Sequence, residues 1–262
     1  MPAPAWKAAG AWVSAASGTV SPAWPAGHAA GDIGLLIVET NSWPVNIPTR
    51  SGFRMIPWSP QKHGSPAGFS SGLTVYWCRA SSGAMPNPVI EVPGNRAYAA
   101  IITFSGVGVG GVPWTVGTGR RMSNSASVSF PSVTTPEADN LIVHIMTNQG
   151  FRTGSGWANG ALTGVTERVD TFDDDAGVIV VTGVKASAGA TGNTTGTLST
   201  SANQTQIVIA LSPNAQAEDK SPDRGLAGAI VESASGNVTP VWPVHEAGDI
   251  GLLICEGGDG NI

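Results

Sequence analysis

Three patterns in the chain contain residue types that could carry out or support chemistry. Residues 68–72 read Gly-Phe-Ser-Ser-Gly, the G-x-S-x-G spacing in which many hydrolases place a nucleophilic serine. That role needs a strand before the serine and a helix after it, whereas here a Pro/Gly-rich segment precedes it and a strand pattern follows. We interpret these residues as an ordinary turn.

The second pattern is the glycine-rich stretch at residues 106–111, which follows an apolar strand as a dinucleotide-binding loop would. A loop of that kind must open a helix whose N-terminus meets the phosphates. The residues that follow, Val112-Pro-Trp114, are unsuited to such a helix. We therefore expect a flexible loop between two strands.

The third pattern is a group of carboxylates near residue 170. Hard oxygen ligands gathered in one loop could bind Ca²⁺, although the spacing does not match an EF-hand and no glycine stands at the required turn. A solvated acidic hairpin tip is the alternative interpretation. Ca²⁺ is the one cofactor that the sequence suggests. The candidate ligands are Asp170, Asp173, Asp174 and Asp175.

The nine tryptophans could bind a glycan, because an exposed indole on a loop can stack on a sugar ring. Trp24 recurs as Trp242 in an internal repeat, which favours a packing role for that pair. For the tryptophans in or near predicted loops, packing is again the favoured interpretation, and glycan binding is the alternative. Those candidates for glycan binding are Trp43, Trp58, Trp114 and Trp157.

The histidines show no metal-binding spacing. His28 and His245 occupy equivalent repeat positions, so we expect a structural hydrogen bond near the adjoining Gly-Asp turn. His144 lies inside a strand pattern and is expected to be a buried residue with satisfied hydrogen bonds. No residue is predicted to be catalytic, and an enzyme would need a pair of facing carboxylates that the sequence does not reveal.

Bulk composition excludes several classes of protein. Charged residues are only 12% of the chain, the net charge is −5 and the pI is near 5.3, which argues against a nucleic-acid binder. The one basic pair, Arg120-Arg121, is too small to change that expectation. Hydrophobic residues at 41% disfavour disorder. The first residues lack the pattern of a secretory signal, and the apolar runs are strand-sized, so no membrane span is expected.

An internal repeat is the strongest feature of the chain. Residues 9–39 and 227–256 align with one gap, at Gly27, and 21 of the 30 paired positions are identical. The repeat predicts a tandem array of similar domains or a subunit that lends strands to a neighbour. Cys255 stands where the first copy has Val38, so we expect it and Cys78 to be free thiols rather than a disulfide.

Gly and Pro punctuation between short apolar runs predicts roughly ten strands and no sustained helix. Two of these strands have distinctive patterns. Residues 33–40 form a nearly continuous apolar run, which we expect to be buried on both faces. Residues 73–79 alternate between two faces. A proline at residue 57 confines residues 53–58 to a sheet edge. The other predicted strands are residues 11–16, 98–105, 125–130, 140–147, 165–171, 177–185, 196–200 and 205–212.

The predicted fold class is therefore all-β, an antiparallel β-sandwich or jelly-roll-like domain with a partial second copy at the C-terminus. The domain spans residues 1–212. Residues 213–226, which are polar and contain two prolines, form a linker. Residues 227–262 begin the second copy, whose apolar strand should self-associate or pair with a neighbouring copy. The residues predicted for assembly are Ile250, Leu252, Leu253, Ile254 and Cys255.

The order of these segments resembles the β-sandwich domains of tailed-bacteriophage virion and tail-fibre-like structural proteins. The matching landmarks begin with residues 30–39, 73–80, 100–106 and 113–114. They continue with residues 156–157, 166–170, 183–186 and 206–213. The chain departs from the pattern near Gly52-Phe53, where relatives carry Gly-Trp. The resemblance implies a structural or adhesive virion role and brings no catalytic residues.

Two functions follow as expectations. The first is a non-enzymatic structural component of a phage particle, such as a fibre, tail or surface decoration, that contacts other virion proteins. It would be made in the host cytoplasm without a signal peptide and reside in the virion. The alternative is an adhesion module that binds a glycan on a host surface. Neither function involves nucleic acid or a membrane span.

Overall fold

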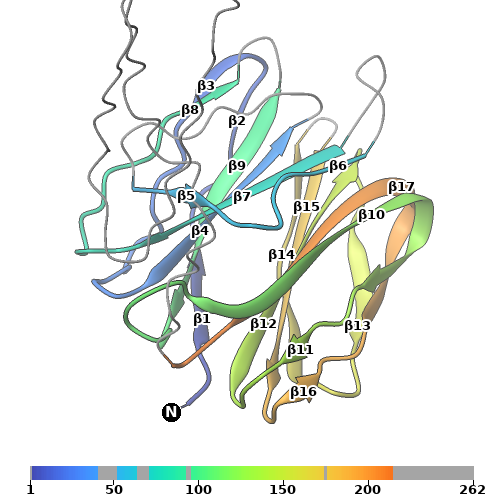
Figure 1. The fold of residues 1–262 in the computed structure, drawn as a ribbon. Helices are drawn as coiled ribbons and strands as arrows, with labels where there is room; N and C mark the ends of the chain where they lie inside the picture. The colour runs from blue at the N-terminus through green and yellow to red at the C-terminus, as the bar shows by residue number, and fades with distance from the viewer. Residues whose placement is uncertain (1, 41–51, 64–70, 93–95, 174–175, 215–262) are drawn as a thin grey trace, which may run out of the picture. The chain divides into compact units, whose positions relative to one another are not determined.

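The computed structural model describes residues 2–40, 52–63, 71–92, 96–173 and 176–214. Within these ranges the regular secondary structure is entirely β, with strands β1 to β17 and no helix (Figure 1). The chain divides into two compact units, Met1–Ala217 and Glu218–Ile262, and all described residues belong to the first. Trp43, Asp174, Asp175 and the second copy of the repeat lie outside the described residues.

The first large sheet is antiparallel and has β4 at its centre. Its main strand order is β1 (Ala5–Ala9), β9 (Ala97–Ser105), β4 (Ile33–Thr40), β7 (Ser71–Arg79) and β5 (Arg54–Met55). Two short strands extend its edges: β2 (Val13–Ala15) pairs with β9, and β6 (Gln61–His63) pairs with β7. The predicted edge position of residues 53–58 is confirmed, because β5 pairs with β7 alone among the described strands.

The second large sheet is also antiparallel and contains the two longest strands. Its main order is β10 (Trp114–Phe130), β17 (Thr194–Leu211), β12 (Asn140–Gln149), β15 (Ala176–Lys185) and β14 (Thr163–Asp173). β13 (Gly154–Ala158) pairs with the first residues of β17. Two small sheets complete the fold: β3 (Gly18–Val20) with β8 (Ile90–Val92), and β11 (Thr134–Thr135) with β16 (Gly189–Ala190).

The two large sheets pack face to face, and alternation along each strand decides which side chains enter the space between them. On β4, Ile33, Leu35 and Ile37 face the second sheet, whereas Leu36 and Val38 face the layer formed by β3 and β8. All eight residues of β4 are buried. The prediction of a strand buried on both faces is confirmed.

The alternation predicted for β7 is confirmed as well. Leu73 and Val75 belong to the core between the two sheets, with Trp77 packed against it, and Tyr76 and Cys78 belong to the outer cluster. A strand that is apolar on both faces needs a covering layer on each side. Here the second sheet covers one face, and the β3–β8 ribbon with its flanking loops covers the other.

One prediction about the strands is wrong. Residues 196–200 and 205–212 form parts of the single strand β17, and residues 125–130 are only the end of the 17-residue strand β10. Both strands bend, and their far halves fold back over the outer face of the second sheet (Figure 1). Val128, Phe130 and Leu198 there cover a third apolar cluster. The sequence did not reveal that β10 and β17 are continuous, because polar residues interrupt their apolar pattern at the bend.

These observations confirm an all-β antiparallel sandwich. Strands that run on past a bend are a known way for one strand to contribute to two packed layers. In this chain the bend also exposes polar groups at the end of the second sheet.

Candidate functional site

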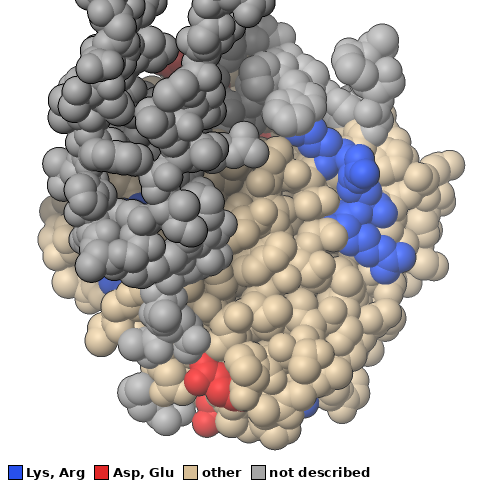
Figure 2. Space-filling view, in the orientation of Figure 1, with Lys and Arg blue, Asp and Glu red and all other residues tan. Residues whose placement is uncertain are grey.

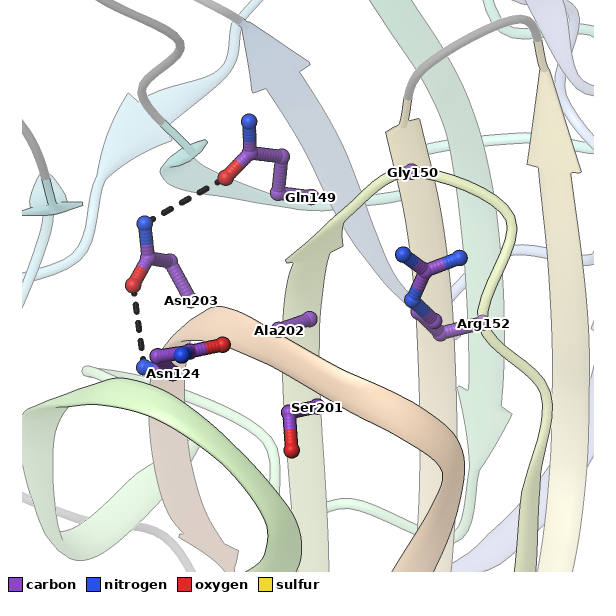
Figure 3. Close-up of a pocket in the computed structure, with 7 residues that line it drawn as sticks. All are labelled: Asn124, Gln149, Gly150, Arg152, Ser201, Ala202 and Asn203. Carbon is purple, nitrogen blue, oxygen red and sulfur yellow. Dashed lines mark hydrogen bonds between the residues drawn. The ribbon is translucent and has the colours of Figure 1, made fainter.

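A cavity of about 300 Å³ opens where β10 and β17 bend (Figure 3). Of the described residues that line it, none is acidic and one is charged, and polar side chains predominate. The lining residues are Asn124, Gln149, Gly150, Arg152, Ser201, Ala202 and Asn203. The cavity is therefore a polar depression with a single cationic group.

Irregular pairing between β10 and β17 produces this cavity. Met122 pairs with Gln204 and Ser125 with Ala202, so the two residues between them on β10 oppose only Asn203 on β17. That is a β-bulge, a feature that re-aims side chains and recurs beside binding sites. Asn124 takes a φ of 33°, a left-handed value that asparagine adopts more readily than most residues.

Hydrogen bonds hold the amide side chains of the cavity in place. The side-chain oxygen of Asn203 accepts a bond from the Asn124 backbone N–H at 3.0 Å, and its amide nitrogen donates to Gln149 Oε1 at 3.3 Å. Arg152 donates from Nη1 to the Phe151 carbonyl at 3.3 Å, while its buried Nε has no partner among the described residues. Several polar groups of the cavity are thus positioned but not saturated.

The part of β10 just before the bulge carries further cationic groups. Arg121 donates from Nη1 to the Lys62 carbonyl at 3.2 Å, and Arg120 donates to the Ser129 carbonyl at 3.1 Å. Burial lowers the pKa of Lys62 to about 8. Figure 2 shows a band of Lys and Arg side chains that continues across this face, over β6 and β10.

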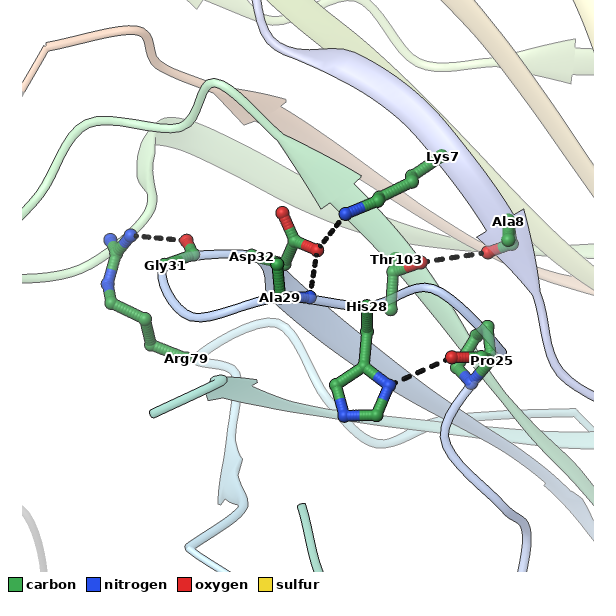
Figure 4. A network of polar contacts seen from close by, with 9 residues as sticks. All are labelled: Lys7, Ala8, Pro25, His28, Ala29, Gly31, Asp32, Arg79 and Thr103. Carbon is green, nitrogen blue, oxygen red and sulfur yellow. Dashed lines mark hydrogen bonds and ion pairs between the residues drawn. The ribbon is translucent and has the colours of Figure 1, made fainter. Parts of the chain in front are cut away.

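A second polar cluster surrounds the turn before β4 (Figure 4). Asp32, which is 5% exposed, accepts bonds at one carboxylate oxygen from Lys7 Nζ at 2.6 Å and from the Ala29 backbone N–H at 2.8 Å. Arg79 donates to the carbonyls of Gly31 at 3.1 Å and Gly108 at 2.6 Å. These bonds tie the first strand, the turn and β7 together.

His28 belongs to that turn and has two structural contacts. Its Nδ1 lies 2.9 Å from the Pro25 carbonyl, which can only accept, so Nδ1 carries the proton. Nε2 then accepts from the Met85 backbone N–H at 3.3 Å. Both ring nitrogens are occupied, and the predicted hydrogen bond near the Gly-Asp turn is present.

His144 is enclosed between the second sheet and the folded-back halves of β10 and β17. Its Nδ1 donates to the Val181 carbonyl at 3.2 Å, so Nε2 is unprotonated and accepts from the Thr194 hydroxyl at 2.9 Å. Asn159 Nδ2 donates in turn to that hydroxyl oxygen at 2.9 Å. Burial lowers the pKa of His144 to about 4. The ring is neutral near pH 7, as expected for a core histidine.

The glycan candidates Trp58 and Trp114 form part of a packed aromatic group. Trp114 is buried and meets Trp58 and Trp77 edge to face, with ring centroids 5.6 and 5.5 Å apart. Trp58 is half-buried and lies over Gly117, where a Cβ would come within 2.4 Å of the ring. These rings pack against the edge of the central core.

Trp157 is also half-buried and lies over two glycines. A Cβ at Gly196 would come within 2.4 Å of its ring, and one at Gly154 within 2.5 Å. Its Nε1 donates to Glu167 Oε2 at 2.5 Å, and its ring lies 5.9 Å from that of Phe130. The fourth glycan candidate, Trp43, lies outside the described residues.

Of the four candidate Ca²⁺ ligands, the structure describes Asp170 and Asp173. Asp170 accepts a bond from the Gly154 N–H at 2.9 Å, and burial raises its pKa. Asp173 pairs with Arg96 at 3.6 Å. No group of three metal-binding side chains occurs among the described residues, and Asp174 and Asp175 fall outside them.

The residues predicted for assembly lie outside the described ranges, but their counterparts in the first copy are placed. The alignment pairs Ile250, Leu252 and Ile254 with Ile33, Leu35 and Ile37, the three β4 side chains that enter the central core. Cys78 is a buried free thiol whose pKa burial raises. Cys255 lies outside the described residues.

Sequence reasoning missed the cavity. Its lining comes from the bends of β10 and β17 and from the end of β12 with the residues that follow it, which are far apart along the chain, and amide residues carry no spacing signal. The available signal was the basic pair Arg120-Arg121 together with the polar interruption of the apolar pattern that follows it.

Comparisons of the chain with protein-family models, with curated proteins and with solved structures find no match. The described residues contain no helix with the length and apolar character needed to cross a membrane.

Proposed function

We propose that this chain is a non-enzymatic structural component of a phage particle, in a fibre, a tail or a surface decoration. One observation carries the proposal: the repeated segment corresponds in its first copy to β2, β3 and β4. Because β4 is the central strand of its sheet, a second copy of that segment should need a pairing strand on each side.

Those requirements follow from the pairing of β4. It pairs with β7 from Ile33 to Thr40 and with β9 over the same residues, and both of its faces are covered. Residues 227–262 repeat the sequence of β2 to β4. We therefore expect the repeated segment to pair with strands like β7 and β9, either in a tandem neighbour or in another copy of the chain. Unpaired apolar strands are strong drivers of such association.

The chemistry of the described residues is consistent with a scaffold. His28 and His144 have both ring nitrogens engaged in structural bonds. Glu167 and Asp170 bond to Trp157 and Gly154. Low charge and a two-sheet core favour a rigid building block. The resemblance to virion proteins in the order of segments along the sequence supports placement in a phage particle.

Native mass spectrometry and sedimentation velocity of the intact chain test the assembly step. Strand exchange between copies predicts discrete oligomers of the 26.5 kDa chain that depend on concentration. Leu252→Asp should reduce them to monomers, because it places a charge where the first copy buries Leu35 in the core. Monomers at every concentration would contradict assembly through this segment. Antibody labelling of purified particles tests the virion location separately.

A further inference from the structure

Basic residues of β10 lie close to the cavity along the strand. Arg120 and Arg121 precede the bulge on β10, Asn124 lies within it, and Asn203 links Asn124 to Gln149 through hydrogen bonds. Arg152 follows Gln149 by three residues and completes the cavity lining. We call these residues together with Phe151, Phe172 and Ser201 the bend surface.

The arginines of the bend surface have unused donor capacity. A guanidinium offers five N–H donors. Arg120, Arg121 and Arg152 each use one donor in a bond to a backbone carbonyl. The ion pairs found among the described residues are Lys7–Asp32 and Arg96–Asp173, and neither includes these arginines. In a chain of net charge −5, the bend surface contains three arginines that pair with no carboxylate among the described residues.

The remaining groups fit saccharides. Amide side chains both donate and accept, as sugar hydroxyls do, and Asn124, Gln149 and Asn203 present three amides around the cavity. Phe151 and Phe172 form an exposed edge-to-face pair, with ring centroids 5.3 Å apart and exposed fractions of 53% and 45%. Exposed aromatic rings can cover the apolar face of a sugar.

We propose that the bend surface binds an acidic polysaccharide, with its carboxylate groups held by Arg121 and Arg152 and its hydroxyl groups by the cavity amides. Arginine suits this ligand because its planar fork matches a carboxylate in two parallel hydrogen bonds. A polymer fits better than a single sugar, since Arg152 lines the cavity while Arg121 lies outside its lining, three residues before Asn124 on β10. The proposal goes beyond the structural role and does not depend on it.

A nucleic acid is the competing anionic ligand, and the composition of the bend surface favours the saccharide. Nucleic-acid binding normally relies on many Lys and Arg contacts to phosphates and on a basic domain. Here three arginines share the surface with amides and a serine, and the whole chain is acidic.

Affinity electrophoresis and biolayer interferometry of the full chain test the proposal. The probes are polygalacturonate, uncharged dextran and a 20-nucleotide oligo-dT at the same ionic strength. We expect binding to polygalacturonate and none to dextran. Arg121→Ala and Arg152→Ala should each weaken binding about tenfold, the effect of losing one charge-assisted hydrogen-bonded contact. Arg152→Lys should recover part of the loss.

Lys185→Ala is the matched control. It also removes one positive charge, but far from the cavity. Lys185 pairs with Asn140 at one end of β12, whereas the cavity residue Gln149 lies at the other end, so binding should be unchanged. Equal binding to dextran, tighter binding to oligo-dT, no binding to any probe, or equal losses from Lys185→Ala and Arg121→Ala would each overturn the proposal. Because these variants leave residues 227–262 intact, the oligomeric state reports on the proposed function independently.

Discussion

The turn around Asp32 and the bend surface are both polar, but they differ in how fully their hydrogen-bonding groups are used. In the turn, Lys7 and the Ala29 N–H share one carboxylate oxygen, and Arg79 reaches two carbonyls. On the bend surface, each arginine makes a single bond to a carbonyl, and Arg152 Nε is buried without a described partner.

This difference separates two uses of polar residues. Buried polar groups stabilise a fold when their partners lie within the protein, because an unsatisfied group costs free energy. Groups with spare donors at a surface gain their remaining partners from solvent or a ligand. We therefore expect substitutions in the turn to reduce stability and substitutions on the bend surface to reduce binding.

The largest effect should come from acid, through His144. Its folded-state pKa of about 4 lies below the ordinary value of 6.5, so the unfolded chain binds a proton first as the pH falls. The stabilisation from keeping the ring neutral is complete above pH 6.5 and is lost progressively between pH 6.5 and 4. The loss should approach about 3 kcal/mol, at 1.36 kcal/mol per pKa unit.

Urea unfolding at several pH values measures this loss. The His144→Gln variant lacks the titrating ring and should show a shallower decline over the same pH window, after correction for its lower starting stability. Parallel pH profiles for the two proteins would mean that His144 is not the group responsible, and that the enclosure between the sheet and the folded-back strands opens readily.

Asp32→Ala should have the next largest effect, lowering the free energy of unfolding by about 2 kcal/mol. The substitution removes an acceptor that satisfies Lys7 and the Ala29 N–H at once. Lys7 alone should matter less, because its side chain is 31% exposed and can reach water. Thermal and urea unfolding of Asp32→Ala, Lys7→Ala and the double variant would measure the coupling. A loss of unfolding free energy below about 0.5 kcal/mol would mean that the Asp32 contacts contribute no more than an exposed ion pair does.

Gly196→Ala tests whether Trp157 is a packing residue. The added methyl would come within 2.4 Å of the indole, and such overpacking typically costs about 1–3 kcal/mol. Gly160→Ala is the control, since nothing lies within 4 Å of its Cβ position. Urea unfolding should separate the two variants. Equal stability would indicate that the indole moves freely, which would restore Trp157 as a ligand-binding candidate.

Local pattern predicted much of the sandwich. Continuous apolar character predicted that β4 is buried on both faces, and strict alternation separated Leu73, Val75 and Trp77 of β7 from Tyr76 and Cys78. Both patterns lie within eight or nine consecutive residues, so they can be recognised without knowing which distant strands pair.

The bend could not be predicted in that way. Its bulge arises from pairing between residues near 124 and 203, which are about 80 positions apart, and no local rule specifies that register. The packing of Trp157 likewise depends on Gly154 and Gly196, brought together only by the pairing of β13 with β17. Sequence alone favoured packing over glycan binding for Trp157, but it could not identify the glycines against which the ring packs.

The smallest expected effect on stability belongs to Arg121→Ala and Arg152→Ala, and it is the most discriminating. Each should change the free energy of unfolding by less than about 0.5 kcal/mol, as ordinary surface substitutions do, because water replaces the single carbonyl contact that is lost. The same variants should weaken binding to polygalacturonate about tenfold. A stability loss above 1 kcal/mol in urea unfolding would instead make these arginines structural, like Arg79, and would remove the distinction between the bend surface and the turn.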